Sequence, residues 1–132
     1  MTGDYEQFQR WYTSKTTDVT LLAADSNKDN CIAVKSANHQ LFIQKIFYNI
    51  VTSAAQTVTF RDDAGTPINV GIIPASATGS VLFDFGPRGF ALTAGKNLDI
   101  INTAGPAGQI HIEAYERQVS GSLNTGIAAA SQ

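Results

Sequence analysis

Few side chains in this sequence have the types and spacing that chemistry requires. The chain of 132 residues has one cysteine, Cys31, and two histidines, His39 and His111. A catalytic zinc site needs three convergent protein ligands and one open position. His111 and Glu113 are two residues apart on one face of an expected strand, but His39 lies far away in an expected loop. A polar outer sheet face explains these residues better, so we predict no metal site and no cofactor.

The segment from Asp25 to Ser36 resembles the start of a calcium-binding loop, because acidic or amide side chains occupy alternate positions. Such a loop needs a glycine at its sixth position and a glutamate at its twelfth. This chain has Asn30 and Ser36 there. A polar hairpin between two strands accounts for the same residues, and we favour that interpretation.

Nucleophilic and acid–base catalysis find equally little support. Cys31 begins the apolar run Cys-Ile-Ala-Val, and cysteines in such runs are most often simply buried. Asp62 and Asp63 share a turn and the other carboxylates are scattered, so no pair is placed for glycosidic chemistry. The glycines at 86–89 lack the lysine and the strand-loop-helix context of a phosphate-binding loop. We therefore predict that the protein is not an enzyme.

The elements that must position these residues are expected to be β-strands. Between residues 17 and 119, short runs rich in Val, Ile, Phe and Thr alternate with Gly, Pro, Asn and Asp. No segment there has a helical period of useful length, so the crossover helices of a parallel sheet are missing. We predict an all-β fold, an antiparallel β-sandwich or jelly roll of about eight strands. The candidate strands are 18–23, 31–35, 40–52, 56–62, 69–73, 79–85, 89–92, 97–102 and 109–118.

Alternation of apolar and polar residues assigns the two faces of several strands. In the last strand, Ile110, Ile112 and Ala114 are expected to face the core, and the residues between them to face outward. The same alternation predicts five further inward residues: Val58, Phe60, Val81, Phe83 and Phe85. These are half-buried antiparallel strands.

The segment from Leu41 to Val51 is different, because large apolar residues occur at both parities. It is a central strand covered on both faces, or a strand with one face on another subunit. A bulge near Gln44 and Lys45 that exchanges inward and outward positions also fits. The residues that we expect at an oligomer interface are Phe42, Ile46 and Tyr48.

The ends of the chain differ from its middle. We divide it into an N-terminal arm, residues 1–16, a β-sandwich domain, 17–119, and a flexible C-terminal tail, 120–132. Asp4 and Gln7 nearly form a capping box for a short helix in the arm. The arm docks on a neighbour or folds back over its own sandwich, and the sequence favours neither. The residues that we expect to bind a partner are Tyr5, Phe8, Trp11 and Tyr12 in the arm and Arg88 at the tip of a glycine-flanked turn.

Charge and hydropathy restrict the classes of partner. Nine Lys and Arg residues against eleven Asp and Glu give a net charge of −2, without a basic stripe, so we expect no nucleic-acid binding. No run approaches the roughly 18 apolar residues of a membrane helix, and no export signal is evident, so we expect a soluble protein and no membrane contact. Only 15% of residues are charged, which favours a surface covered by neighbours.

The blocks at 40–50, 57–62, 79–89 and 98–100, with the final strand Ile-His-Ile-Glu-Ala-Tyr at 110–115, carry a resemblance to a known class. With the neutral composition, this strand rhythm resembles the head decoration, or cement, proteins of tailed bacteriophages, which are small β-sandwich virion proteins. The resemblance covers residues 17–118. It implies a homo-oligomer, with a trimer favoured, that is made in the host cytoplasm and binds the major capsid protein on the virion surface. No catalytic residues come with it.

Two other functions are considered. A receptor- or carbohydrate-binding module of a phage tail or fibre needs exposed aromatic residues grouped on one face. The only tryptophan lies in the arm, and Tyr48 and Tyr115 lie on strands, so the sequence supplies such a platform poorly. An enzyme on a jelly-roll scaffold has the least support, because the sequence holds so few candidate ligands, acids and bases.

Overall fold

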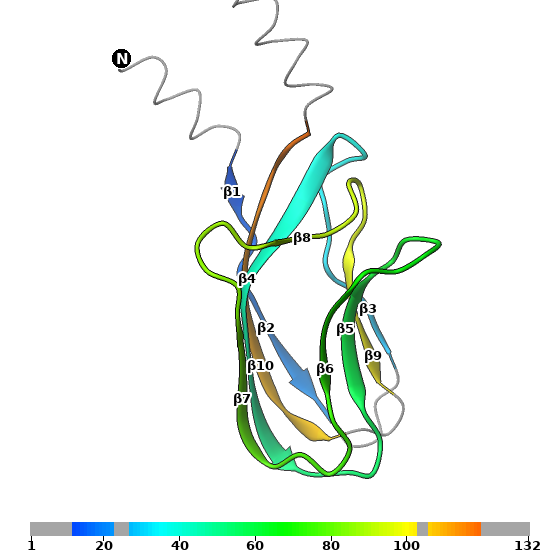
Figure 1. Cartoon of the computed structure of the whole chain (residues 1–132), viewed down its shortest axis with the longest axis vertical. Helices are drawn as coiled ribbons and strands as arrows, with labels where there is room; N and C mark the ends of the chain where they lie inside the picture. The colour runs from blue at the N-terminus through cyan, green and yellow to red at the C-terminus, as the bar shows by residue number, and fades with distance from the viewer. Residues whose placement is uncertain (1–11, 23–26, 103–105, 120–132) are drawn as a thin grey trace, which may run out of the picture.

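The computed structural model describes residues 12–22, 27–102 and 106–119 (Figure 1). These residues form ten β-strands in two antiparallel sheets that pack face to face. The predicted all-β sandwich is confirmed. The described part of the chain contains no helix, and therefore none that could span a membrane. The helix expected in the arm and the flexible tail lie outside the described residues.

The two sheets differ in size. The six strands of the first sheet are β1 (Thr13–Ser14), β2 (Thr17–Leu21), β4 (His39–Thr52), β7 (Gly79–Asp84), β8 (Phe90–Ala91) and β10 (Ala107–Gln118). The four strands of the second sheet are β3 (Lys28–Ile32), β5 (Val58–Asp62), β6 (Asn69–Ile73) and β9 (Leu98–Asn102). The long strands β4 and β10 pair along their whole length and form the centre of the first sheet. Strand β2 pairs with the other side of β10, and β7 and β8 pair with the other side of β4.

Most strand bounds lie within two residues of the prediction, but β3 begins three residues earlier than expected. Its pairing with β9 is irregular because Asn30 has a left-handed φ of 56°. The backbone N–H of Val34 donates to the side chain of Asn97, which ends the strand early. The favoured polar hairpin at 25–36 is therefore partly strand. Strand β1 is an addition, since its residues fall within the expected arm and pair with β10.

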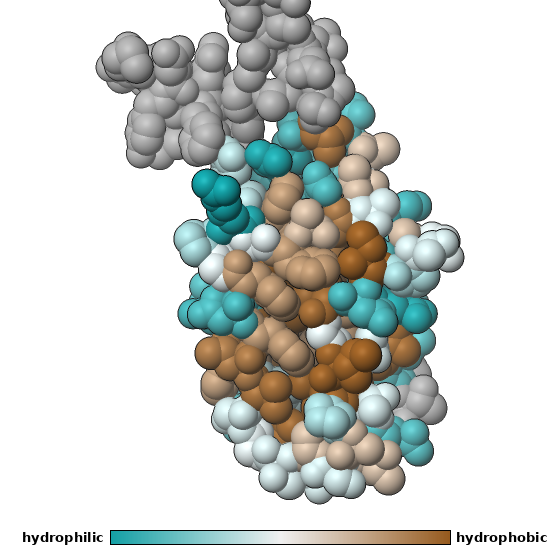
Figure 2. All heavy atoms as spheres, viewed as in Figure 1, coloured by the Kyte–Doolittle hydropathy of each residue, from teal (hydrophilic) through white to brown (hydrophobic). Residues whose placement is uncertain are grey.

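The core lies between the two sheets. The residues predicted to face inward from β5 and β10 are at most 2% exposed, as the alternation of their strands requires. The ring of Phe83 on the edge strand β7 packs against Gly71 of β6, so closely that a Cβ atom added to Gly71 would lie 3.0 Å from the ring. Apolar side chains gather between these two edge strands (Figure 2). Phe83 therefore helps to close the side of the sandwich where the sheets end.

A buried carboxylate joins two connections at one edge of the core. Asp62 is fully buried at the end of β5. Its Oδ1 accepts the backbone N–H groups of Ala64, at 3.3 Å, and Ile68, at 2.9 Å, and its Oδ2 accepts that of Thr93, at 2.9 Å. Burial alone would raise the pKa of Asp62. The hydrogen bonds from Thr93, Ile68 and Ala64 have the larger combined effect, so the pKa lies below its ordinary value. The carboxylate ties the β5–β6 turn to the β8–β9 connection.

Candidate binding surfaces on the first sheet

A β-bulge in β4 determines which side chains reach the outer face of the first sheet. Glu113 of β10 pairs with Lys45, but Ala114 pairs with Ile43, so Gln44 is the extra residue. Before the bulge the odd-numbered Ile43 is fully buried, and after it the even-numbered Ile46 is. The hypothesis of a bulge that exchanges the two faces is confirmed.

The three residues expected at an oligomer interface are covered by the chain itself. Ile46 and Tyr48 are 0% exposed in the core, and Phe42 is 8% exposed. The Tyr48 hydroxyl donates to the carbonyl of Pro106, and burial raises the pKa of Tyr48 to about 12. Ile46 and Tyr48 therefore pack between the two sheets, in place of the expected contact with another subunit.

Phe42 takes part in an aromatic stack on the outer face. Its ring lies 5.0 Å from that of Tyr115, with an interplanar angle of 9°. The guanidinium of Arg117 lies 4.7 Å from the centre of the Phe42 ring, and Tyr12 packs against Tyr115 at 5.3 Å. We call these four residues the aromatic stack. The bulge creates it, because the bulge turns Phe42 outward.

The glycine-flanked segment 85–89, with Arg88 in it, does not reverse the direction of the chain. Strands β7 and β8 run in the same direction along β4, so this segment is a loop that interrupts one edge strand opposite the bulge. Gly86 and Gly89 have φ values of 76° and 79°, which favour glycine. A Cβ atom on Gly89 would also lie 3.1 Å from the carbonyl oxygen of Ile43. The two glycines therefore let the loop leave the edge and return to it.

Two hydrogen bonds hold this loop on the outer face. The side-chain amide of Gln44 donates to the carbonyl of Pro87 at 2.8 Å, and the Tyr115 hydroxyl donates to the carbonyl of Arg88 at 2.6 Å. The loop borders a groove of about 510 Å³, which we call the end groove. Residues that line it include Tyr12, Ser14, Gln44, Pro87, Arg88 and Tyr115.

The end groove brings together two of the five residues expected to bind a partner, Tyr12 and Arg88. The other three, Tyr5, Phe8 and Trp11, lie outside the described residues. The sequence places Tyr115 on a strand but does not mark it as a partner-binding residue, because its neighbours in the groove come from distant parts of the chain.

Arg88 lines the end groove, and Arg117 belongs to the aromatic stack beside it. Arg117 and Arg88 form no ion pair with any carboxylate in the described ranges. Both arginines are exposed. This part of the surface can therefore accept carboxylates from another molecule.

A buried ion pair fixes the segment that leads to the groove. The Glu116 side chain is 2% exposed, and its Oε1 lies 2.8 Å from Lys15 Nζ. His39 Nε2 lies 3.8 Å from the other carboxylate oxygen. The backbone N–H of Lys15 also donates to the carbonyl of Ala114 at 2.8 Å. Val119 bonds to the connection before β4, so the described chain begins and ends at the same end of the sandwich (Figure 1).

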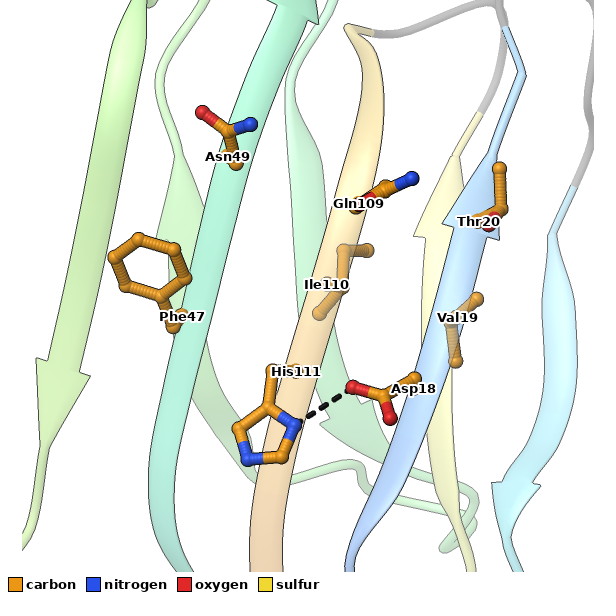
Figure 3. Close-up of a pocket in the computed structure, with 8 residues that line it drawn as sticks. All are labelled: Asp18, Val19, Thr20, Phe47, Asn49, Gln109, Ile110 and His111. Carbon is orange, nitrogen blue, oxygen red and sulfur yellow. Dashed lines mark hydrogen bonds and ion pairs between the residues drawn. The ribbon is translucent and has the colours of Figure 1, made fainter.

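A second groove, of about 570 Å³, crosses β4, β10 and β2 on the same outer face (Figure 3). We call it the face groove. Residues that line it include Asp18, Thr20, Phe47, Asn49, Gln109 and His111. They form two adjacent rows, because Phe47, His111 and Asp18 are in register, and so are Asn49, Gln109 and Thr20.

His111 is held between two carboxylates. Its Nδ1 lies 2.6 Å from Asp18 Oδ1, and its Nε2 lies 3.1 Å from Glu113 Oε2. Only the imidazolium donates through both nitrogens, and the hydrogen bonds to Asp18 and then Glu113 raise the pKa of His111. His111 and Glu113 do lie together, as expected, but no group of three or more metal-ligating side chains occurs among the described residues.

Cys31 is packed against β9 of the second sheet. Its thiol donates to the carbonyl of Leu98 at 3.2 Å. Burial, followed by the nearby charge of Asp99, raises the pKa of Cys31 to about 12. The thiolate that nucleophilic chemistry requires is therefore strongly disfavoured in the folded protein.

Comparisons with known proteins show limited similarity. No family model matches the chain, and a search of curated proteins finds no match. Among solved structures, the chain is similar to one described in a study of Bacillus endospore appendages as a family of disulfide-linked pili. The TM-score is 0.47 and the identity is 15%, over 83% of this chain and 88% of that one. It is also similar to the Drosophila NLP core, described in terms of pentamer formation and histone binding. That TM-score is 0.47 with 14% identity, over 78% of this chain and 98% of that one.

Proposed function

We propose that this protein is a non-enzymatic structural subunit that binds a viral capsid shell, in the manner of a decoration protein, through its end groove. The observation that carries the proposal is the gathering of Tyr12, Tyr115 and Arg88 around one groove. Tyrosine and arginine are enriched among the residues that contribute most to protein–protein binding. The sequence resemblance to phage decoration proteins supplies the kind of partner, a major capsid protein.

The groove is built as a preformed contact surface. Tyr115 is fixed by its stacking on Phe42 and by its hydrogen bond to the carbonyl of Arg88, so little side-chain freedom remains to be lost on binding. Arg88 and Arg117 form no ion pair with a described carboxylate, so they match carboxylates on a partner. We infer that the capsid surface presents an acidic and apolar segment to this groove.

The N-terminal segment joins the sandwich at this groove, because Tyr12 lines it. We propose that residues 1–11, which precede Tyr12 in the sequence, extend this contact onto the partner. In a trimer, three such contacts would act together, which raises the effective concentration of each without new kinds of contact.

The first experiment is to count copies of this chain per purified virus particle by quantitative mass spectrometry. Hundreds of copies, in a fixed ratio to the major capsid protein, are expected of a shell component. A handful of copies would place the chain in a tail or fibre and contradict the proposal.

The second experiment measures rebinding of purified variants to shells that lack the chain. Arg88→Ala and Tyr115→Ala should each weaken binding at least tenfold, as residues at the centre of a contact do. Lys35→Ala, which removes an exposed cation outside the groove, should not. Deletion of residues 1–11 keeps Lys15 and its buried partner, so it tests the arm without unfolding this end. Unchanged binding by both groove variants would refute the proposed contact.

A further inference from the structure

We propose that the face groove is a binding site for a neutral oligosaccharide. This inference uses a surface that the proposed capsid contact does not need, and it stands whether or not that contact exists. The groove lies over β4, β10 and β2 (Figure 3), and its residues differ from those of the end groove. Its volume of about 570 Å³ is in the range of small-molecule sites.

The chemistry of the two rows is that of a polyol site. Thr20, Gln109 and Asn49 form a line of hydroxyl and amide groups across three strands. Thr20 and Gln109 form no side-chain hydrogen bond with a described residue, so their donors and acceptors are available. Asn49 accepts a hydrogen bond of 3.4 Å from Ser80 and keeps its amide N–H groups free. Hydroxyl groups both donate and accept, and amides offer both functions.

The neighbouring row supplies an apolar surface. The Phe47 side chain is 39% exposed, and in Figure 3 its ring stands on the outer side of the sheet beside the Asn49 amide. A pyranose has one face of C–H groups and a rim of hydroxyls, so it can pack on Phe47 while its hydroxyls reach the amide row. A groove with an apolar platform and a few convergent polar groups is typical of a ligand site.

The polar groups at the end of this row are already oriented. His111 holds Asp18 Oδ1 at 2.6 Å, which leaves Asp18 Oδ2 free to accept from a ligand hydroxyl. With Glu113 also bonded to His111, two carboxylates surround one imidazolium. The residues that line the groove include no Lys or Arg to pair with an anionic ligand, and its one cation, the His111 imidazolium, is already bonded to carboxylates, so the structure assigns the groove to neutral sugars.

The test titrates the full chain with neutral hexaoses of glucose, mannose, galactose and xylose, and with hexagalacturonate as the anionic comparison. Binding is followed by isothermal titration calorimetry and by NMR of the phenylalanine ring protons. At least one neutral hexaose should bind and shift the Phe47 ring signals, and hexagalacturonate should not. Phe47→Ala and Gln109→Ala should each weaken that binding roughly tenfold.

Matched controls are Ile72→Ala, an exposed apolar residue on the second sheet, and Gln56→Ala, an exposed amide in the β4–β5 connection. Both controls should leave the affinity unchanged. The proposal is overturned if no neutral hexaose binds at millimolar concentration, or if the groove variants bind as tightly as the controls. It is also overturned if Phe47→Ala instead changes only the oligomeric mass in light scattering, because the groove would then be a protein interface. The copy number per particle addresses the capsid contact separately.

Discussion

The buried ion pair between Lys15 and Glu116 gives a sharp prediction about stability. Lys15→Met removes the partner of a carboxylate that is 2% exposed, because Lys15 Nζ lies 2.8 Å from Glu116 Oε1. Breaking a buried pair on one side costs about 3–5 kcal/mol. Lys15 is itself 29% exposed, so water reaches its side of the pair. We therefore expect a loss of about 2–4 kcal/mol in the free energy of unfolding.

The assay is urea denaturation monitored by circular dichroism. With a slope of about 2 kcal/mol per molar urea, the midpoint should fall by about 1–2 M. The control is the same substitution in a Glu116→Gln background, where no buried charge remains and Lys15→Met should cost less than about 1 kcal/mol. Equal costs in the two backgrounds, or a loss below 1 kcal/mol in the native chain, would refute the reasoning.

Three further predictions concern titrating groups. Asp62→Asn should cost about 2–4 kcal/mol at neutral pH, because a charged acceptor of several backbone N–H groups is lost. The pKa of Asp62 is lower in the folded protein than in the unfolded chain. The Asp62 carboxylate therefore stabilises the fold fully above the ordinary carboxyl pKa, and this stabilisation is lost as pH falls through the folded pKa. The urea midpoints of the native protein and the Asp62→Asn variant should therefore converge in acid. His111→Gln should lower the midpoint at pH 5–6. The difference in midpoint between the native protein and the His111→Gln variant should shrink as pH rises through the raised pKa of His111. The same difference should be smaller in an Asp18→Asn background, because Asp18 is the main cause of the raised pKa. Cys31, with its pKa raised to about 12, should react with a disulfide reagent at pH 8 only at the rate of unfolding, which a urea series with the same reagent would check.

The alternation of apolar residues was sufficient to predict most of the fold. In β5 and β10 the side chains alternate strictly, so the inward set follows from the period of two. In β4 the pattern is compatible with several arrangements, and only the pairing of Ala114 with Ile43 shows that the bulge is the correct one. Local pattern thus determines the faces of a strand wherever the strand is regular.

The grooves could not be predicted in the same way, because they depend on register between distant strands. Tyr12, Arg88 and Tyr115 meet through the pairing of β1 with β10 and through a loop opposite the bulge. The sequence identifies two of these residues separately as candidate contacts: Arg88 because glycines flank it, and Tyr12 because it belongs to an aromatic N-terminal segment. It contains no signal that places them at one groove, and the same holds for Phe47 and Gln109 in the face groove.

The position of the chain ends has a practical consequence for engineering. The described chain begins at Tyr12, which lines the end groove, and ends at Val119 at the same end of the sandwich, so a cargo joined directly before Tyr12 or after Val119 is attached beside the end groove. The connections at 53–57 and 74–78 lie at the opposite end and are linked by a hydrogen bond of 2.7 Å from Ser76 to the carbonyl of Ala54. An epitope or reporter domain inserted after the exposed Ala55 would point away from that groove. The molecule is therefore better suited to carrying foreign sequences in this internal loop than at its termini.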